Sequence, residues 1–578
     1  MGKKDVYLID LAHESQLGLG SDHMPLQLGL IGAYLLKEVG DRVDVEIFKF
    51  IGDFERAVKE RQPFVVGASN YMWNINLGYH IARLLKKHCP ETIFVFGGPN
   101  YPIGPEEQAS FMRKYPAVDF WVYRDGEIPF ARLVRTLLDN PDDIKSVKKS
   151  GLPSCHTLVG DEPYFGELEA RTRDLSVIPS PYLTGLMDKF FDHPLVPSIQ
   201  TDRGCPFECT FCIEGKKYYN KVAMLAPEWS TAEVGYIVAR VRHTQTLRIV
   251  NSNFGMFKKD VELCRYLGEL RKKTGYPDYI SCSTGKNQKE RILECTELVG
   301  GAMRVSASVQ SLVPEVLRHV KRDNISLDAM MVFSQEATQA NGHVISEIIL
   351  GLPGDSLEGQ EASMAGLVGA GVSSVIQHQL ALLPGTEAAS DESRNTFGLK
   401  GAFRPIQRCV GRYSFVGETF TAVDVEEISI STHKLTFEDY LEARRLYLTV
   451  GLFYNDGVFQ EIHSLLRLLG LPSWEWLMRI HKRVSESSPQ LGTLYEGFIR
   501  ETKGELWETE EDLRRDVSSS VDRYIKGEVG DNLIYKYRVL GLLTYFDELH
   551  GLAFRTLRDY LACEGVNIES AIWDIEKF

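Results

Sequence analysis

Three cysteines that can act together as metal ligands, Cys205, Cys209 and Cys212, stand within one stretch of eight residues. They lie in a loop that follows a short strand-like run at 196–199 and contains a glycine and a proline. Such a backbone lets all three sulfurs converge on one point. The pattern therefore predicts a metal cluster held by three thiolates.

The number of further ligands decides between zinc and iron. A structural zinc site takes four Cys or His ligands, but the next cysteine is Cys264, the nearest downstream histidine is His243, and His193 precedes the strand. The local set closes at three. Three thiolates on a four-iron cluster leave one iron open to another ligand. A fortuitous cysteine-rich loop or an incomplete zinc knuckle remains the alternative reading of the spacing.

With the aromatic Phe211 just before its last cysteine, this loop resembles the CxxxCxxC signature of the radical S-adenosylmethionine (AdoMet) family. The resemblance implies a [4Fe-4S] cluster whose open iron binds the amino and carboxylate groups of AdoMet. Reduction through the cluster then cleaves AdoMet to a 5′-deoxyadenosyl radical. Thiolates suit this chemistry because they are soft, anionic ligands for iron–sulfur clusters.

The elements that must position the loop repeat as strand and helix through residues 191–402. Six strands in such a repeat predict a partial (β/α)6 barrel, and catalytic groups of parallel barrels come from the carboxyl ends of strands. The cysteine loop follows the first of them. The expected strands are 197–201, 247–251, 279–283, 303–308, 343–351 and 375–380. The expected helices are 231–243, 258–273, 288–299, 314–321, 327–340 and 357–371.

Polar residues at the later strand ends resemble further family features. Gln310 and Arg322 resemble residues that hold the amino-acid and ribose portions of AdoMet, and Glu347, ahead of a Gly-Leu-Pro-Gly turn, resembles the acid on the ribose hydroxyls. Asn253 lies in the turn that replaces the family's glycine-rich one. It has a carbonyl and a side-chain acceptor for the AdoMet amino group. Each of these residues alone also fits a structural polar role, and no residue is assigned as general acid or base.

The first 145 residues alternate apolar strands with helices, which predicts a doubly wound, Rossmann-like α/β domain. The expected strands are 6–10, 44–48, 64–68, 93–97 and 120–123, and the expected helices are 26–38, 54–60, 77–88 and 105–114. Ligands of such sheets bind outside the carboxyl ends of the strands. No GxGxxG follows the first strand, so the dinucleotide fingerprint is absent.

The strand order and the strand-end loops resemble the N-terminal cobalamin-binding domain of one radical-AdoMet class. The resemblance implies a cobalamin bound without a lower histidine ligand, because the DxHxxG motif does not occur. A Rossmann-like domain that binds nothing is the alternative. The expected cobalamin-binding residues are Ser69, Asn70, Tyr71, Gly97, Gly98, Pro99, Gly126 and Glu127.

Between and after these domains the chain changes character. Residues 146–190 are rich in proline, which predicts an extended linker over the surface. Residues 403–578 predict a helical C-terminal domain that covers the barrel mouth, with helices at 458–469, 473–485, 494–502, 510–525, 532–549 and 552–564. An N-terminal capping pattern at Thr436 opens an earlier helix.

Composition limits the classes of partner. A net charge of −14 argues against a broad nucleic-acid surface. No run of 18 apolar residues and no signal-peptide pattern occurs, so we expect no membrane span and a cytoplasmic location. Ten cysteines in 578 residues are no disulfide scaffold.

The family resemblance implies one of two enzyme activities. In the first, the enzyme is a methyltransferase that uses the radical and methylcobalamin to methylate an unactivated carbon. In the second, it is a cyclase or rearrangement enzyme that uses cobalamin as a redox partner. Either takes a small-molecule or lipid substrate and an external electron donor such as flavodoxin or ferredoxin. A cobalamin sensor is a third reading, but a sensor has no use for the cysteine loop.

Overall fold

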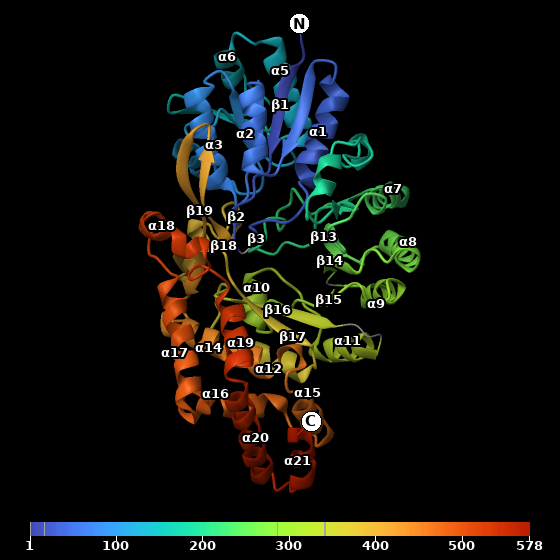
Figure 1. Cartoon of the computed structure of the whole chain (residues 1–578), viewed down its shortest axis with the longest axis vertical. Helices are drawn as coiled ribbons and strands as arrows, with labels where there is room; N and C mark the ends of the chain where they lie inside the picture. The colour runs from blue at the N-terminus through green and yellow to red at the C-terminus, as the bar shows by residue number, and fades with distance from the viewer. Residues whose placement is uncertain (1, 17, 286, 340–342, 578) are drawn as a thin grey trace.

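The N-terminal part of the protein is a seven-stranded sheet flanked by helices on both faces (Figure 1). The structure is a computed structural model and describes residues 2–16, 18–285, 287–339 and 343–577. The strands lie in the order β4 (Val43–Phe48), β1 (Lys4–Ile9), β5 (Val65–Ser69), β6 (Ile93–Gly97), β7 (Phe120–Val122), β8 (Cys155–Val159) and β9 (Glu162–Phe165). The helices are α1 (Leu26–Val39), α2 (Ile51–Glu60), α3 (Ile75–His88), α4 (Pro105–Lys114), α5 (Glu127–Asp139) and α6 (Ile144–Lys149).

The first five strands of this sheet, β1, β4, β5, β6 and β7, are parallel and lie in the spatial order 2-1-3-4-5, which is the flavodoxin-like variant of the doubly wound sheet. Strand β1 shows why the sequence predicted buried strands. Val6 and Leu8 face one core with α1 and α5, while Tyr7 and Ile9 face another with α2, α3 and α4. Both faces are therefore covered, and all five predicted strands are confirmed.

The predicted linker 146–190 is wrong in its first half. Residues 155–165 form β8 and β9, which extend the sheet in antiparallel fashion beyond β7. The prolines that suggested a loop are compatible with this place because β9, which contains Pro163, is an edge strand. Only two short 3-10 turns, Leu175–Val177 and Asp188–Asp192, follow before the central part.

The central part holds two three-stranded parallel sheets. One contains β10 (Ser198–Ile199), β13 (Thr246–Phe254) and β14 (Tyr279–Thr284), and the other contains β15 (Val305–Ser306), β16 (Val344–Leu350) and β17 (Ser374–Gln379). A parallel bridge between Ile280 and Met303 connects them. All six predicted strands are confirmed. The helices are α7 (Pro227–Val238), α8 (Lys258–Thr274), α9 (Lys289–Leu298), α10 (Pro314–His319), α11 (Leu327–Gln339) and α12 (Leu357–Gly369).

The C-terminal region does not begin as helix, contrary to the prediction for 403–578. Two long strands, β18 (Lys400–Phe415) and β19 (Glu418–Ser431), form an antiparallel hairpin. The hairpin rises beside α3 and reaches the N-terminal sheet domain (Figure 1). Phe415 stacks on Phe54 of α2 with ring centroids 5.5 Å apart. The hairpin thus connects the C-terminal region to the N-terminal domain.

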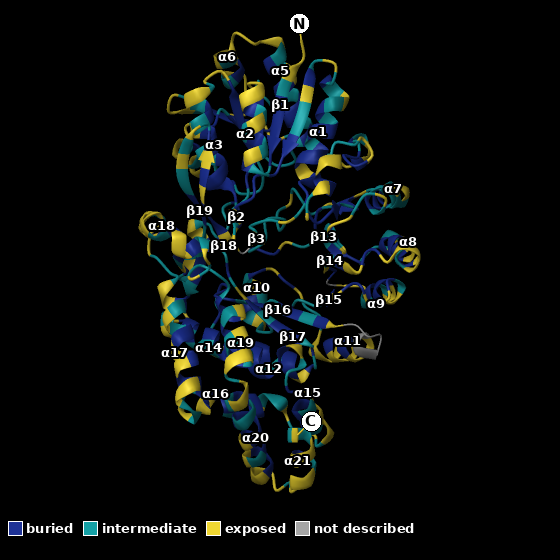
Figure 2. Cartoon of the chain, viewed as in Figure 1, coloured by how far each residue is buried: buried dark blue, intermediate teal, exposed yellow. Residues whose placement is uncertain are grey.

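Helices follow the hairpin, as predicted, and pack below the central part (Figures 1 and 2). The capping box at Thr436 is present, with Asp439 as its reciprocal partner. The break predicted at 550–551 falls earlier, at Tyr545. The helices are α14 (Phe437–Phe453), α15 (Gln460–Leu468), α16 (Ser473–Ser487), α17 (Pro489–Gly504), α18 (Glu510–Ile525), α19 (Leu533–Thr544), α20 (Phe546–Cys563) and α21 (Glu569–Lys577).

These helices pack on α12, β17 and the hairpin. From this region the hairpin contacts α2 and α3 of the N-terminal domain. No helix in the described part of the chain is long and apolar enough to cross a membrane.

Candidate cofactor site

The three cysteines lie in the loop after β10, where the central sheets face the N-terminal domain. Cys205 and Cys209 are buried and Cys212 is half-buried. Two of the predicted AdoMet residues contact their sulfurs: Asn253 Nδ2 lies 3.2 Å from Cys205 Sγ, and Arg322 Nη1 lies 4.0 Å from Cys209 Sγ. The fold therefore gathers residues from distant parts of the sequence around the predicted cluster ligands.

The donor set fits an iron–sulfur cluster. Burial, followed by the nearby charges of Glu214 and of the other two thiolates, raises the pKa of Cys212 to about 11. A bound cation stabilises such thiolates in place of their protons. Among the described residues, no three His, Cys, Asp or Glu side chains are close enough together to share a single metal ion. Ligands of a cluster bind different irons, so they do not need that closeness.

A cavity of about 240 Å³ opens on the side of Asn253 and Arg322, and we call it the polar cavity. It lies at the carboxyl ends of β13, β14, β15 and β16, where a parallel barrel places its ligand-binding groups. Side chains with hydroxyl, amide and charged groups line most of it: Ser252, Asn253, Ser283, Thr284, Lys289, Ser306, Ser308, Gln310, Arg322, Asp323, Asn324 and Glu347.

The polar cavity contains four of the five AdoMet-binding residues predicted outside the cysteines. Arg322 is buried, donates to the Ser308 carbonyl, and lies 2.9 Å from Asn324 Oδ1. Glu347 accepts a 2.6 Å hydrogen bond from the Ser308 hydroxyl, and His378 Nε2 stands 3.5 Å from its other oxygen. The hydrogen bond from His378 is the largest influence on Glu347 and lowers the pKa of that carboxyl.

Gln310 and Phe211 differ in their position relative to the polar cavity. Gln310 has a φ of +66°, and its buried Oε1 has no hydrogen-bond partner among the described residues. A buried acceptor without a partner that faces a cavity is suited to accept a hydrogen bond from a ligand. Phe211 instead packs among Val316, Val320 and Leu352 and does not line the polar cavity. Its contact with AdoMet stays a prediction.

A second cavity of about 240 Å³ lies at the carboxyl ends of β5, β6 and β7, and we call it the apolar cavity. Seven of the eight predicted cobalamin residues line it: Ser69, Tyr71, Gly97, Gly98, Pro99, Gly126 and Glu127. Asn70 does not, because its side chain turns away and donates to the Asn100 carbonyl at 2.8 Å. Leu8, Val95, Val122 and Phe130 form the apolar wall.

Gly98 explains why glycine is needed in this wall. Its φ is +145°, and a Cβ at this position would stand 2.5 Å from the Asn70 carbonyl oxygen. The backbone of the Gly97–Gly98–Pro99 turn can therefore approach a ligand closely, which no side-chain-bearing residue would allow.

Arg203 and Glu127 join the apolar cavity to the cysteine loop. Glu127 is buried and Arg203 is half-buried, and the two side chains form two hydrogen bonds, of 2.7 and 3.2 Å. Two sequence steps separate Arg203 from Cys205. Glu214, two residues after Cys212, also lines the apolar cavity and accepts a hydrogen bond from Ser252, which lines the polar one. The cysteine loop is thus bonded to both cavities.

Sequence reasoning missed several residues of the apolar cavity, among them Gln200, Arg203, Glu214 and Tyr219. Their position close to the cysteines in the sequence could have identified them. Arg124 was also missed, although it stands between Tyr123 and Asp125 in a loop that had been identified.

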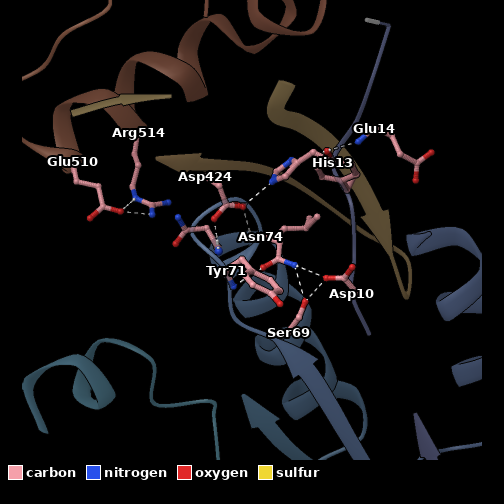
Figure 3. A network of polar contacts seen from close by, with 12 residues as sticks. Asp10, His13, Glu14, Ser69, Tyr71, Asn74, Asp424, Glu510 and Arg514 are labelled. Carbon is pink, nitrogen blue, oxygen red and sulfur yellow. Dashed lines mark hydrogen bonds and ion pairs between the residues drawn. The ribbon is translucent and has the colours of Figure 1, made fainter. Parts of the chain in front are cut away.

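A buried polar network supports the Tyr71 loop (Figure 3). Asp10, at the end of β1, accepts hydrogen bonds from Ser69 (2.6 Å) and Asn74 (3.2 Å), and Lys49 pairs with its other oxygen at 2.9 Å. Asn74 Oδ1 in turn accepts from the Tyr71 amide at 3.0 Å. The loop is fixed before any ligand arrives.

The same view shows why His13 is no candidate for a cobalt ligand (Figure 3). Its Nε2 lies 2.7 Å from Asp424 of β19, and its Nδ1 lies 2.8 Å from the Tyr413 hydroxyl of β18. Asp424 also accepts from the Asn76 amide at 2.7 Å. Both ring nitrogens are engaged, so His13 holds the hairpin to the N-terminal domain.

A third space, of about 770 Å³, lies between α4, the loop after β17 and the hairpin, and we call it the outer chamber. Tyr101 and Gly385 meet at its inner end, where a Cβ at Gly385 would stand 2.5 Å from the Tyr101 carbonyl oxygen. Three of its five acids are paired: Glu426 with Arg404, Glu427 with Arg394 and Glu510 with Arg514. The outer chamber is large enough for a small-molecule substrate.

Comparison with known proteins agrees with this geometry. The family described as B12 binding domain matches residues 18–134. A 2-(S-pantetheinyl)-carbapenam-3-carboxylate methyltransferase of Streptantibioticus cattleyicolor is 29% identical over 462 residues, 77% of this chain and 65% of that protein. The cobalamin-dependent radical SAM methyltransferase TokK of Streptomyces tokunonensis is 29% identical over 350 residues, 59% of this chain and 50% of that protein. The chain therefore spans between half and two thirds of the length of these relatives.

Two solved structures share the fold. The cobalamin-dependent S-adenosylmethionine radical enzyme OxsB, with aqua-cobalamin and S-adenosylmethionine bound, superposes with a TM-score of 0.55 at 14% identity over 100% of this chain and 83% of its own. The radical S-adenosylmethionine methyltransferase TsrM of Kitasatospora setae gives 0.51 at 14% identity over 67% and 76%. The family predicted from the cysteines and strand-end loops is confirmed. The chain is thus similar to cobalamin-dependent radical AdoMet enzymes, and its residues 18–134 match the B12 binding domain family.

Proposed function

We propose that the protein is a cobalamin-dependent radical AdoMet methyltransferase that methylates an unactivated carbon of a small molecule. One observation carries the proposal: a loop of three thiolates is bonded on one side to a glycine-rich apolar cavity and on the other to a polar cavity. Both of the first two relatives are named methyltransferases. This favours methylation over cyclisation or rearrangement.

The cofactors are a [4Fe-4S] cluster, AdoMet and cobalamin, of which AdoMet supplies a carbon radical and cobalamin a methyl group. Cys205, Cys209 and Cys212 hold the cluster. Asn253, Gln310, Arg322 and Glu347 bind AdoMet in the polar cavity, with Arg322 and Glu347 held in place by Ser308. The predicted role of Phe211 at the AdoMet site belongs to the same proposal.

The apolar cavity receives part of the cobalamin. The Gly97–Gly98–Pro99 turn presents backbone to it, while Ser69, Tyr71, Gly126 and Glu127 complete its wall. Asn70 supports the turn through Asn100. Because the Asp10 network and the Arg203–Glu127 pair are already formed, little reorganisation accompanies binding.

We assign the architecture accordingly. Residues 1–145 with β8 and β9 form the cobalamin-binding domain, residues 191–402 form the partial radical-AdoMet barrel, and a hairpin followed by helices completes the chain. The substrate enters the outer chamber. A cytoplasmic flavodoxin or ferredoxin supplies electrons to the cluster.

Labelled AdoMet tests the proposal. Anaerobically reconstituted protein, given a reductant, cobalamin and AdoMet with a deuterated methyl group, should transfer three deuterons to a metabolite of a cell extract and release 5′-deoxyadenosine. The measurement is mass spectrometry of the extract. Formation of 5′-deoxyadenosine with a rearranged but unlabelled product would replace methylation by the cyclase or rearrangement activity. The absence of both would remove the radical assignment.

A further inference from the structure

Two basic side chains lie beside the cysteine loop without an acidic partner. Lys216 follows Cys212 by four residues, and its Nζ is buried with no hydrogen-bond partner among the described residues. Arg124, in the loop after β7, likewise has a buried Nε with no partner in that part of the chain. Its Nη2 donates to a neutral group, the Tyr123 hydroxyl, at 2.7 Å.

The neighbouring acids already have partners. Asp125 pairs with Arg171 at 3.2 Å, and Glu127 pairs with Arg203 at 2.7 Å. Glu214 accepts the Ser252 hydroxyl. Asp125 and Glu127 therefore neutralise other cations, and among the described residues no carboxylate forms an ion pair with Arg124 or Lys216.

Both cations occupy one corner of the molecule. The Arg124 guanidinium carbon lies 5.5 and 5.6 Å from the ring centroids of Tyr218 and Tyr219, the second and third residues after Lys216. Burial, followed by the positive charge of Arg124, lowers the pKa of Lys216 to about 7, opposed by Glu107 of α4. Glu107 is exposed and forms no ion pair with Lys216 in the described structure.

The corner lies beside residues of both the apolar cavity and the outer chamber. Arg124 lines the apolar cavity. A Cβ at Gly385, which lines the outer chamber, would stand 3.4 Å from Lys216 Nζ. Arg124 is therefore reached from the apolar cavity, and Lys216 lies directly behind the wall of the outer chamber at Gly385.

Two half-buried side chains of like charge, with Arg124 Nε and Lys216 Nζ buried, are costly without a counter-ion, and an anion between them offsets the cost of both. An arginine fork and a lysine ammonium together suit the oxygens of a carboxylate or a phosphate. We propose that Arg124 and Lys216 form a binding site for one such anionic group. Within the proposed function, that group belongs either to the substrate in the outer chamber or to the nucleotide tail of cobalamin.

Inorganic phosphate is the probe. The full chain, reconstituted anaerobically with its cluster, is heated with increasing phosphate, and with chloride at matched ionic strength, both with and without cobalamin. A ligand that binds only the folded state raises the unfolding midpoint. We expect a saturable rise specific to phosphate in at least one of the two states. Lys216→Met and Arg124→Gln should each increase the half-saturating phosphate concentration roughly ten- to a hundredfold, because each removes a charged hydrogen bond.

Two variants serve as controls. Lys216→Arg keeps a cation and should retain the phosphate effect. Lys217→Met removes the same charge from an exposed position on the same loop and should leave the effect unchanged. Iron content reports whether each variant is folded. If Lys216→Met does not hold iron, Arg124→Gln and Lys216→Arg decide the result.

The cobalamin arms separate the two sources of the anion. A phosphate effect that persists with cobalamin bound assigns the site to the substrate, whereas one that cobalamin abolishes assigns it to the nucleotide phosphate. No phosphate-specific rise in either state, or equal rises in wild type and in folded Lys216→Met, overturns the proposal. The methyl-transfer assay is independent, so loss of the anion site and loss of the proposed function are distinguishable.

Discussion

The apolar and polar cavities on the two sides of the cysteine loop recognise their ligands in different ways. Glycine backbone and apolar side chains from three strand ends form the first, while hydroxyl, amide and charged side chains dominate the second. Shape therefore governs binding in the apolar cavity, whereas individual hydrogen bonds govern binding in the polar cavity. The difference predicts that substitutions in the two cavities should have separable effects.

The cluster is the element that both cavities share, so its loss gives the largest effect. Changing Cys205, Cys209 or Cys212 to alanine should remove the iron, because three thiolates are the minimum for a site-differentiated cluster. Iron and sulfide analysis of anaerobically purified protein measures it. Cys563→Ala, at an exposed position far along the chain, is the control and should keep full iron. Full iron in the triple variant would contradict the assignment.

In the polar cavity a single side chain should matter strongly. Arg322→Ala should weaken AdoMet binding roughly ten- to a hundredfold, because a hydrogen bond to a charged group contributes about 1.5–3 kcal/mol. Iron content and cobalamin affinity should stay unchanged. Equilibrium binding of AdoMet to the reconstituted protein measures it.

The neighbouring Lys321, which forms an exposed ion pair with Glu387, is the matched control. Lys321→Ala should bind AdoMet as wild type does, because exposed pairs contribute little. Equal AdoMet affinities of the Arg322→Ala and Lys321→Ala proteins would show that Arg322 does not bind AdoMet as the resemblance to the family implies.

In the apolar cavity the effect should come from the backbone. Gly98→Ala should weaken cobalamin binding by roughly tenfold or more, since a strained φ and a 2.5 Å contact cost about 1–3 kcal/mol and displace the turn. Gly52→Ala, with open space around its Cβ in the same domain, is the control. Spectral titration with hydroxocobalamin measures both. An AdoMet affinity that falls together with the cobalamin affinity would contradict the separation of the two cavities.

The sequence was most informative where one local pattern decides the structure. Buried parallel strands read as continuous apolar runs, so β1, β5 and β6 were predicted within one or two residues. The strand-end loops then followed from topology, and seven of eight predicted residues line the apolar cavity.

Tertiary partners decide the parts that could not be predicted. The hairpin β18–β19 is stabilised by α3 and α18, and by the His13–Asp424 pair, whose two residues stand 411 positions apart. Pro405 lies where its register shifts, which weakens the strand pattern. The β-branched residues of β19 did indicate a strand. The Arg203–Glu127 pair was equally invisible, because nothing local links two residues on different domains.

A buried carboxyl outside both cavities should have no effect on cofactor binding, the smallest effect that we expect. Glu233 of α7 is buried against the linker and accepts a 2.6 Å hydrogen bond from the Ser180 hydroxyl. Burial raises the pKa of Glu233 to about 7 from an ordinary 4.5. The folded protein thus keeps this proton to about pH 7, while the unfolded chain loses it near pH 4.5. The resulting stability is fully present below pH 4.5 and is lost as pH rises to 7.

Glu233→Gln keeps the shape and removes the titration, so its stability should lack this decline. Relative to wild type, the variant should gain stability progressively between pH 4.5 and 7 and remain level above, by up to about 3 kcal/mol at 1.36 kcal/mol per pKa unit. Denaturant unfolding across that range measures the difference. Cobalamin and AdoMet affinities at pH 7.5 should equal those of wild type. A constant stability difference at all pH values would show that Glu233 is ionised in the folded protein. A changed affinity for either cofactor would show that Glu233 and its surroundings contribute to cofactor binding. The two cavities alone would then not account for that binding.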